Sequence, residues 1–116
     1  MIVKGFVVED ARTGDDLLRL FSALSNAHRL RIFAVLNLRG RNYISQLARD
    51  VGMSRPLLHL HLKKLEEAGL VKSSLELSKD GKALNFFETN DFNVVLTPQA
   101  IIQAVSSLSS KQIKST

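Results

Sequence analysis

The sequence predicts a mainly helical chain with a small β-hairpin, an α+β fold in which helix predominates. Apolar residues recur at helical spacing in five segments, and two of these segments are separated by only about three residues. Near residue 70 the apolar period changes toward two, and a turn sequence follows. Two short helices joined by so tight a turn must pack at a steep angle.

The composition fits one folded domain spanning residues 1–116. The 45% hydrophobic and 23% charged residues are ordinary for a globular chain. The absence of cysteine excludes disulfides, thiolate metal ligands and cysteine nucleophiles. No signal peptide and no membrane-spanning run of about 18 apolar residues is apparent, so we expect a cytoplasmic protein.

The N-terminal residues predict an arm followed by a helix. Residues 2–8 are β-branched and aromatic, which favours a strand or an extended arm, and we assign residues 1–14 to this arm. Thr13 and Asp16 form a capping box in front of a helix at about residues 15–24. Its apolar residues, at positions i, i+3, i+4 and i+7, are Leu17, Leu20, Phe21 and Leu24.

A second helix follows and ends before Gly40. Ser25 or Asn26 can cap it. Its inward face is expected to contain Leu30, Phe33 and Leu36. Ile32 and Val35 are expected to widen this apolar stripe.

The closely spaced helices come next. The third helix is capped by Asn42 and stops at Gly52, and the fourth covers about residues 55–68 with Ser54 as its N-cap and Pro56 in its first turn. Both have an apolar stripe, formed by Ile44, Leu47, Ala48 and Val51 in the third and by Leu58, Leu62 and Leu65 in the fourth.

The C-terminal part predicts a hairpin at residues 70–89 and a last helix. Residues 78–81 supply the hairpin turn, and apolar residues alternate in the strand before it. Together these elements define a core over residues 15–96. Thr97 and Pro98 open a helix that runs to about Leu108, within an assigned segment of 97–110, followed by a frayed tail at 111–116.

Positive charge is concentrated on the helix pair. Residues 28–72 hold nine Lys or Arg and three Asp or Glu, whereas the whole chain has a net charge of +5. A recognition helix reads bases with side chains near its N-terminus and middle, and nearby cations bind phosphates. Arg55 fits a guanine or a phosphate equally well. The predicted DNA contacts on and near this helix are Asn42, Ser54, Arg55, Leu57, His59, Leu60, Lys63 and Lys64.

Three stretches resemble the winged helix-turn-helix of ArsR-like transcriptional regulators. They are LFSALSNAHRLRI at 20–32, ISQLARDVGMS at 44–54 and LHLHLKKLEEAGLV at 58–71. The resemblance covers roughly residues 15–90. It implies a winged helix-turn-helix with an extra C-terminal helix, and a sequence-specific, double-stranded DNA-binding regulator associated with the nucleoid.

The resemblance also implies a homodimer and a wing. The hairpin would contact the DNA backbone through Lys79 and Lys82, and half-sites would lie about one helical turn apart. The family dimerises through its first and last helices. This assigns seven apolar residues of these helices to the interface, although they could equally belong to the core of the monomer. They are Leu17, Leu20, Phe21, Ile101, Ile102, Val105 and Leu108.

Departures from the family pattern exclude its metal sites. Metal-sensing members carry cysteines in the third helix, where this chain has residues 46–50 without cysteine. Zinc-binding members use the last helix, but residues 97–108 contain no His, Asp or Glu. We therefore expect no metal and no cofactor, and the sequence names no effector. His59 and Leu60 stand where the family has other residues, so its base preference does not transfer.

Two other functions compete with specific regulation. A chromatin-like protein would use the same lysines as sequence-tolerant phosphate ligands. A winged-helix module that docks on a protein is kept open by Leu57 and Leu60, although the basic face argues against it. We do not expect an enzyme, because a hydrolytic triad would have to borrow residues from the DNA-facing helix and no glycine-rich phosphate loop is present.

Overall fold

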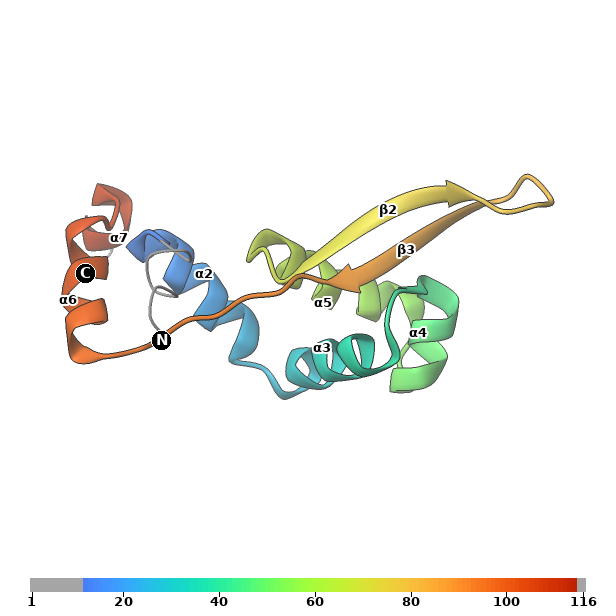
Figure 1. The fold of residues 1–116 in the computed structure, drawn as a ribbon, viewed down its shortest axis with the longest axis horizontal. Helices are drawn as coiled ribbons and strands as arrows, with labels where there is room; N and C mark the ends of the chain where they lie inside the picture. Colours follow the sequence, from blue (N-terminus) through green and yellow to red (C-terminus); the bar gives the residue numbers. More distant parts are fainter. Residues whose placement is uncertain (1–11, 115–116) are drawn as a thin grey trace.

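A computed structural model describes residues 12–114 of the chain. In it, the hairpin of β2 and β3 extends from one end of the helical body, and α6 and α7 lie at the other end (Figure 1). The elements are α2 Gly14–Leu24, α3 Ala27–Arg39, β1 Asn42–Tyr43, α4 Ile44–Val51, α5 Arg55–Glu67, β2 Val71–Leu77, β3 Ala83–Thr89, α6 Pro98–Ser106 and α7 Ser110–Lys114. The predicted mainly helical α+β class is confirmed. The predicted arm at residues 2–8 lies outside the described residues.

The first two helices begin at side-chain caps. The capping box of Thr13 and Asp16 is present at the start of α2. Asn26, rather than Ser25, caps α3 by accepting a hydrogen bond from the backbone N–H of Arg29 at 3.1 Å. Both helix starts are therefore fixed by local sequence, because these side chains satisfy backbone donors that the helix leaves without partners.

The predicted apolar face of α3 was placed wrongly. Ile32 and Leu36 are fully buried, whereas Leu30 is exposed. Ile32 and Leu36 lie four residues apart and share one face, but Leu30 lies about 200° around the helix from Ile32. The buried face of α3 is therefore centred on Ile32 and Leu36, with Phe33 and Val35 packed partly against it.

Helices α4 and α5 form the predicted helix-turn-helix. Gly52 ends α4 in the left-handed conformation, with φ of 67° and ψ of 43°, which a residue without a Cβ adopts without strain. The sequence predicted that Asn42 caps α4, and this prediction is wrong. Asn42 lies in strand β1, and Tyr43 occupies the N-cap position without a side-chain cap.

The sheet has three antiparallel strands in the order β1-β3-β2. The predicted hairpin is confirmed as β2 and β3, which pair from Val71 opposite Thr89 to Leu77 opposite Ala83. Strand β1 was not predicted, because two residues carry no alternating pattern. It pairs with Phe86 and Phe87 only, so the outer part of the hairpin has no third strand.

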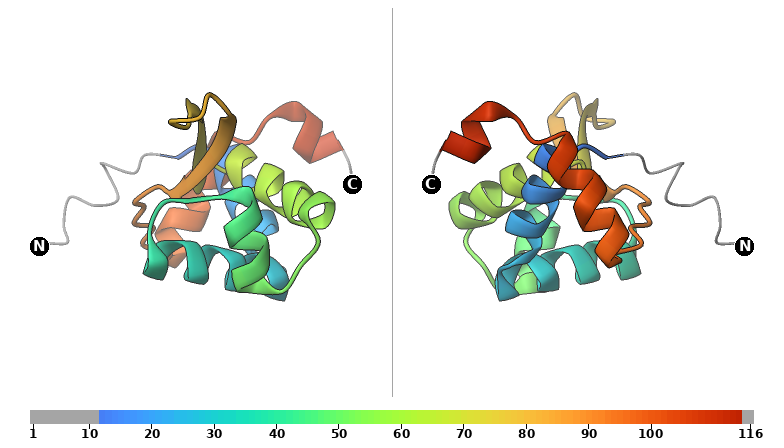
Figure 2. Two further views of the ribbon diagram at one scale, coloured as in Figure 1. Left: turned by 90° about the vertical axis from the view of Figure 1, so that its right-hand side faces the viewer. Right: turned by 90° about the vertical axis from the view of Figure 1, so that its left-hand side faces the viewer.

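The predicted C-terminal helix is present as α6, and a break separates it from a second short helix that the sequence did not predict. Helix α6 ends at Ser106, and residues 110–114 form the short helix α7 where a frayed tail was expected. The break has a tertiary cause, because Ser107 Oγ accepts the N–H of Gly14 at 2.8 Å and the N–H of Ser109 donates to Asp15 at 3.0 Å. These bonds join the break to the first turn of α2, and Figure 2 shows α6 lying alongside α2 at that end of the molecule.

The core lies between α2, α3, α4, α5 and the base of the hairpin. Its members are Leu20, Ala23, Ile32, Leu36, Leu47, Ala48, Val51, Leu58, Leu62, Leu65, Ala68, Leu70, Val71 and Phe87. They hold α4 and α5 at a fixed angle. None of the helices in residues 12–114 has the length and apolar character needed to cross a membrane.

Candidate nucleic-acid interface

Helix α5 begins with a cap and a proline. The side chain of Ser54 accepts the N–H of Leu57 at 3.4 Å, and Pro56 occupies the first turn. Leu58, Leu62 and Leu65 are buried along one side. The opposite side of α5 is therefore presented to solvent.

That outward side is partly apolar. Leu57 is 44% exposed and Leu60 is 65% exposed, so neither is a core residue. The sequence left open whether these leucines pack laterally against the core, and their exposure makes them available to a partner. An apolar side chain in the major groove can contact only the thymine methyl group.

The lysines of α5 face different neighbours. Lys63 and Lys64 are both exposed. Lys64, however, lines a hollow of about 380 Å³ together with Arg19 and Ser22 of α2 and Gln112 of α7. Lys63 does not line it, so the structure separates two residues that the sequence placed in one set.

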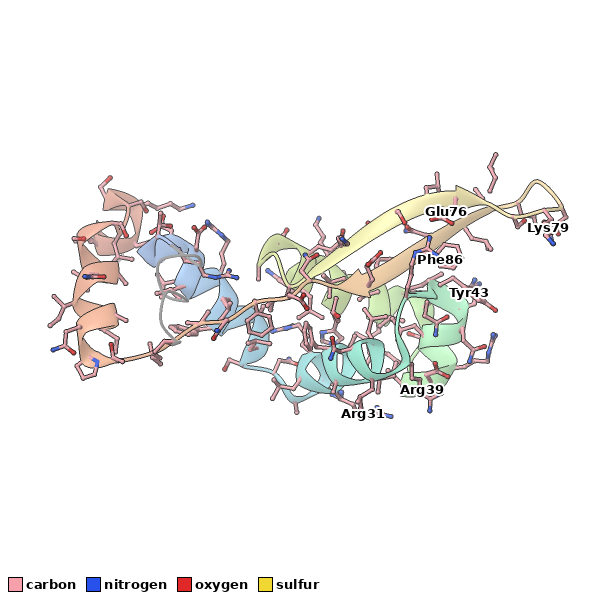
Figure 3. All side chains as sticks on the ribbon, viewed as in Figure 1. Arg31, Arg39, Tyr43, Glu76, Lys79 and Phe86 are labelled. Atoms are coloured by element: carbon pink, nitrogen blue, oxygen red, sulfur yellow. The ribbon has the colours of Figure 1, made fainter. Side chains whose placement is uncertain are left out.

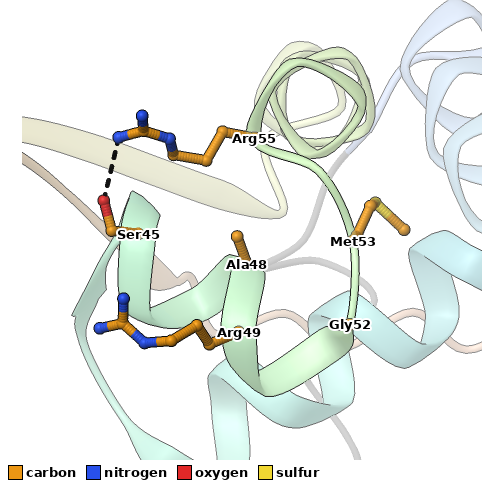
Figure 4. A pocket seen from close by; sticks show the side chains of 6 residues that line it. All are labelled: Ser45, Ala48, Arg49, Gly52, Met53 and Arg55. Carbon is orange, nitrogen blue, oxygen red and sulfur yellow. Dashed lines mark hydrogen bonds between the residues drawn. The ribbon is translucent and has the colours of Figure 1, made fainter.

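Arg55 lies beside α4. Its Nη1 atom donates to the hydroxyl of Ser45 at 3.2 Å, across the open pocket shown in Figure 4. Arg49 lines the same pocket, together with the small residues Ala48 and Gly52. Sequence reasoning missed Ser45 and Arg49, although their spacing of four residues places them on one face of α4.

The two histidines of α5 have different surroundings. His59 is exposed, with its ring 6.2 Å from that of Phe87 at the base of the wing. His61 is half-buried, and its Nδ1 lies 3.2 Å from Arg29 Nη1. Partial burial, the charge of Arg29 and the neighbouring His28 ring lower the pKa of His61, which favours the neutral imidazole. His61 therefore ties α5 to α3 instead of facing a partner.

Arg29 extends this tie to α2. Its Nε atom donates to the carbonyl of Ala23 at 2.7 Å and its Nη2 atom to that of Ser22 at 3.3 Å. One guanidinium thus joins the end of α2 to the middle of α5. This fixes the orientation of the exposed face of α5 relative to α2.

The hairpin tip carries Lys79 and Lys82, both exposed, and Figure 3 shows Lys79 at the far end of the hairpin. The turn between them is held by Ser78, whose backbone N–H donates to the carbonyl of Lys82 at 2.7 Å. The Ser78 hydroxyl and the backbone N–H of Lys82 donate to Asp80 and lower the pKa of its carboxyl. Asp80 thereby helps to shape the turn that presents the two lysines.

Both polar groups of the Asn42 side-chain amide are occupied internally. Its Oδ1 accepts the N–H of Tyr43 at 2.9 Å, and its Nδ2 donates to Asp50 at 3.3 Å. It is half-buried in β1. We leave it out of the interface proposed below.

The predicted dimer residues fall into two groups. Leu20 is buried in the core of the chain and is not available to a partner, which corrects its assignment. Five of the other six line an apolar hollow of about 140 Å³ between α2 and α6, namely Leu17, Phe21, Ile101, Val105 and Leu108. The sixth, Ile102, is 67% exposed on α6.

Comparisons with known proteins agree with this geometry. Residues 26–73 match the family described as "Bacterial regulatory protein, arsR family". An HTH-type transcriptional regulator of Methanocaldococcus jannaschii is 35% identical over 86 residues, which is 74% of this chain and 88% of that protein. The chain belongs to the ArsR-like winged helix-turn-helix regulators.

Two solved structures share the fold. A homodimeric winged helix-turn-helix DNA-binding domain from Mycobacterium bovis has a TM-score of 0.56 at 23% identity and covers 79% of each chain. NolR from Sinorhizobium fredii has a TM-score of 0.53 at 24% identity and covers 79% of this chain and 82% of its own. In this ArsR-like regulator, residues 12–114 contain no group of three or more His, Cys, Asp or Glu that could hold a metal ion.

Proposed function

We propose that this chain is a homodimeric, sequence-specific DNA-binding regulator that inserts α5 into the major groove and rests its wing on the adjacent backbone. The observation that carries the proposal is the outward side of α5, which is basic and unpaired. Within residues 12–114, no acidic side chain lies within ion-pairing distance of Arg55, Lys63 or the two tip lysines. Cations without acidic partners suit a polyanion.

Base reading is assigned to the middle and start of α5. Arg55 lies at the first position of the helix, where its fork can meet a guanine edge or a phosphate. Lys63 and His59 lie one to two turns farther on. The exposed Leu57 and Leu60 add apolar contact with thymine methyl groups. Ser45 and Arg49 extend the basic surface onto α4.

Dimerisation is assigned to the apolar surface of α2 and α6. Helix α6 has no buried residue, although its apolar side chains are large. An apolar surface of this kind on a single chain marks a contact with a partner. The related Mycobacterium bovis domain is homodimeric. A twofold dimer would read a pseudo-palindrome with half-sites about one helical turn apart.

Selection of binding sites from randomised duplex DNA at physiological salt tests the proposal. We expect a twofold symmetric site that binds about 10³ times more tightly than a scrambled duplex. Enrichment of no site, with binding that disappears as salt rises, would instead favour sequence-tolerant coating of DNA. Absence of DNA binding at low salt would favour a protein-docking module.

Single substitutions then test the assignment of α5. Arg55→Ala and Lys63→Ala should each weaken binding to the selected site by about 1–3 kcal/mol, with the fold intact. Lys111→Ala removes the same charge from exposed α7 and is the matched control. Unchanged affinity in both α5 variants would contradict a role for this helix in the groove.

A further inference from the structure

The wing is attached to the helices only at its base. Val71 and Phe87 are buried there, but every later residue of β2 is exposed or nearly so, with Leu75 at 71% and Leu77 at 77%. Strand β1 reaches no farther out than Phe86. A two-stranded hairpin without a packed face is only marginally stable by itself. Some other contact must therefore set the direction of the outer half of the wing.

Arg41 supplies a contact of this kind. It directly precedes β1, at the edge of the sheet opposite β2. Its guanidinium lies over the ring of Phe86 on the middle strand, 4.0 Å from the ring centre. It then forms an ion pair and hydrogen bond with Glu76 of β2, and its Nε lies 3.8 Å from Glu88 of β3. One side chain therefore crosses all three strands.

The register explains why these groups meet. Phe86 pairs with Ser74, so Glu76 lies two residues farther toward the tip on the same face of the hairpin. Glu88 lies on that face at the base. Tyr43 packs edge-on against Phe86 from β1, with the ring centres 6.0 Å apart. Figure 3 shows Tyr43, Phe86 and Glu76 close together along the middle of the hairpin, with Lys79 farther out.

Other contacts to the hairpin lie nearer its base. Ser73 donates to Glu66 of α5, and Thr89 donates to Asn37 of α3. Within residues 12–114, Arg41 is the one cation outside the hairpin that pairs with its acidic residues. Its contact with Glu76 is therefore the outermost link between the wing and the helical body.

We propose that Arg41 is a positioning residue that sets the angle of the wing relative to α5 and so places the tip lysines on the DNA backbone. The inference rests on the proposed function. Two carboxylates and an aromatic face occupy the guanidinium, and the side chain is only 35% exposed. Arg41 therefore acts on DNA through the wing and not as a phosphate ligand.

Substitution of Glu76, an acidic partner of Arg41, gives a sharp test, because positioning and simple electrostatics predict opposite changes in DNA affinity. Glu76→Gln deletes a negative charge from a DNA-binding protein, which by simple electrostatics should raise affinity. Positioning predicts the opposite, a loss of affinity for the selected duplex with an unchanged unfolding midpoint. Glu67→Gln changes an exposed acid of α5 that forms no ion pair within residues 12–114, so it is the control and should bind at least as well as the wild type. Tighter binding by Glu76→Gln would overturn the proposal.

A coupling experiment tests whether Arg41 acts through the tip. Lys79→Gln with Lys82→Gln should lower the slope of log affinity against log salt by about two. Arg41→Gln, introduced into the otherwise unchanged chain, should also lower this slope. Introduced into the chain that already lacks both tip lysines, it should not lower the slope any further. Additive losses would mean that Arg41 contacts DNA by itself and would overturn the proposal. Arg39→Gln, at the end of α3 and paired with Asp50, is the control.

Arg41→Lys separates geometry from charge. Lysine keeps the charge but lacks the planar fork that can stack on a ring while binding two carboxylates. We expect it to bind DNA as weakly as Arg41→Gln, and full rescue would contradict positioning. If the wild type itself bound no DNA, the proposed function would fail; if it bound DNA but lost no affinity on removal of the tip lysines, the positioning role alone would fail.

Discussion

Helices α5 and α6 use their apolar residues in two different ways. In α5, Leu58, Leu62 and Leu65 are fully buried inside one chain. In α6, Ile101, Ile102 and Val105 all remain more than half exposed. Both helices have apolar residues at helical spacing, so the difference lies in what surrounds them and not in their pattern.

The comparison indicates a division of labour. The core around α5 is complete within one chain, and it fixes the angle of the helix-turn-helix and the base of the wing. The surface of α2 and α6 is incomplete, because its hollow is lined by apolar side chains with solvent on one side. Four changes should break or sharpen this contrast.

The largest effect is expected from Leu62→Ala in the core. Loss of this buried side chain should lower the free energy of unfolding by about 2–5 kcal/mol, measured by urea titration. Leu60→Ala makes the same chemical change two residues away at an exposed position and should alter stability by no more than about 0.5 kcal/mol. Equal losses in the two variants would mean that the sides of α5 are assigned wrongly.

Ile102→Glu should act on association and not on folding. A charge placed in an apolar contact between two chains has no partner, so the dimer dissociation constant should rise by at least about 100-fold, measured by sedimentation. Leu38→Glu is the control, since Leu38 is 84% exposed on α3, away from α2 and α6. Dissociation by Leu38→Glu alone would place the interface elsewhere.

Gly14→Ala tests the close approach of α2 to α6. A Cβ at this position would meet the backbone carbonyl of Ala104 and the side chain of Leu108. We expect a loss of about 1–3 kcal/mol in thermal or urea unfolding because α6 must shift. Helix propensity alone favours alanine over glycine by about 1 kcal/mol, so a gain in stability would show that the two helices are not held this closely.

The smallest effect is expected from the titration of His61. Its pKa is lowered in the folded protein from an ordinary value of 6.5, so the unfolded chain binds more protons at acid pH. Stability should therefore fall as the pH drops below 6.5. His61→Gln should flatten this dependence in unfolding experiments, whereas His59→Gln, an exposed imidazole on the same helix, should leave it in place.

The helix-turn-helix was predictable because its signals are local. Ser54, Pro56 and Gly52 act on the backbone within one turn of their own position, and the leucines of α5 follow one period. The turn of the wing was predictable for the same reason, because residues 78–81 carry its signal locally. The buried face of α3 was predicted wrongly, because its apolar residues extend around more than one face and the pattern does not say which face meets α4 and α5.

Much of the candidate site was also local, since the exposed side of α5 follows from its buried side. Two parts of it were not. Asn42 was assigned to a helix cap and lies instead in a strand whose partner is more than 40 residues away. Arg41 carried no sequence signal beyond its charge, because its neighbours come from β2 and β3.

The sequence by itself determined the caps of α2 and α5, the tight turn, the hairpin and the basic surface of α5, because each depends on residues a few positions apart. Tertiary structure alone decided the break between α6 and α7, the third strand, the burial of Leu20 and the reach of Arg41 across the sheet. Each of these depends on groups that are distant along the chain, and their energies exist only once the chain has folded and brought those groups together.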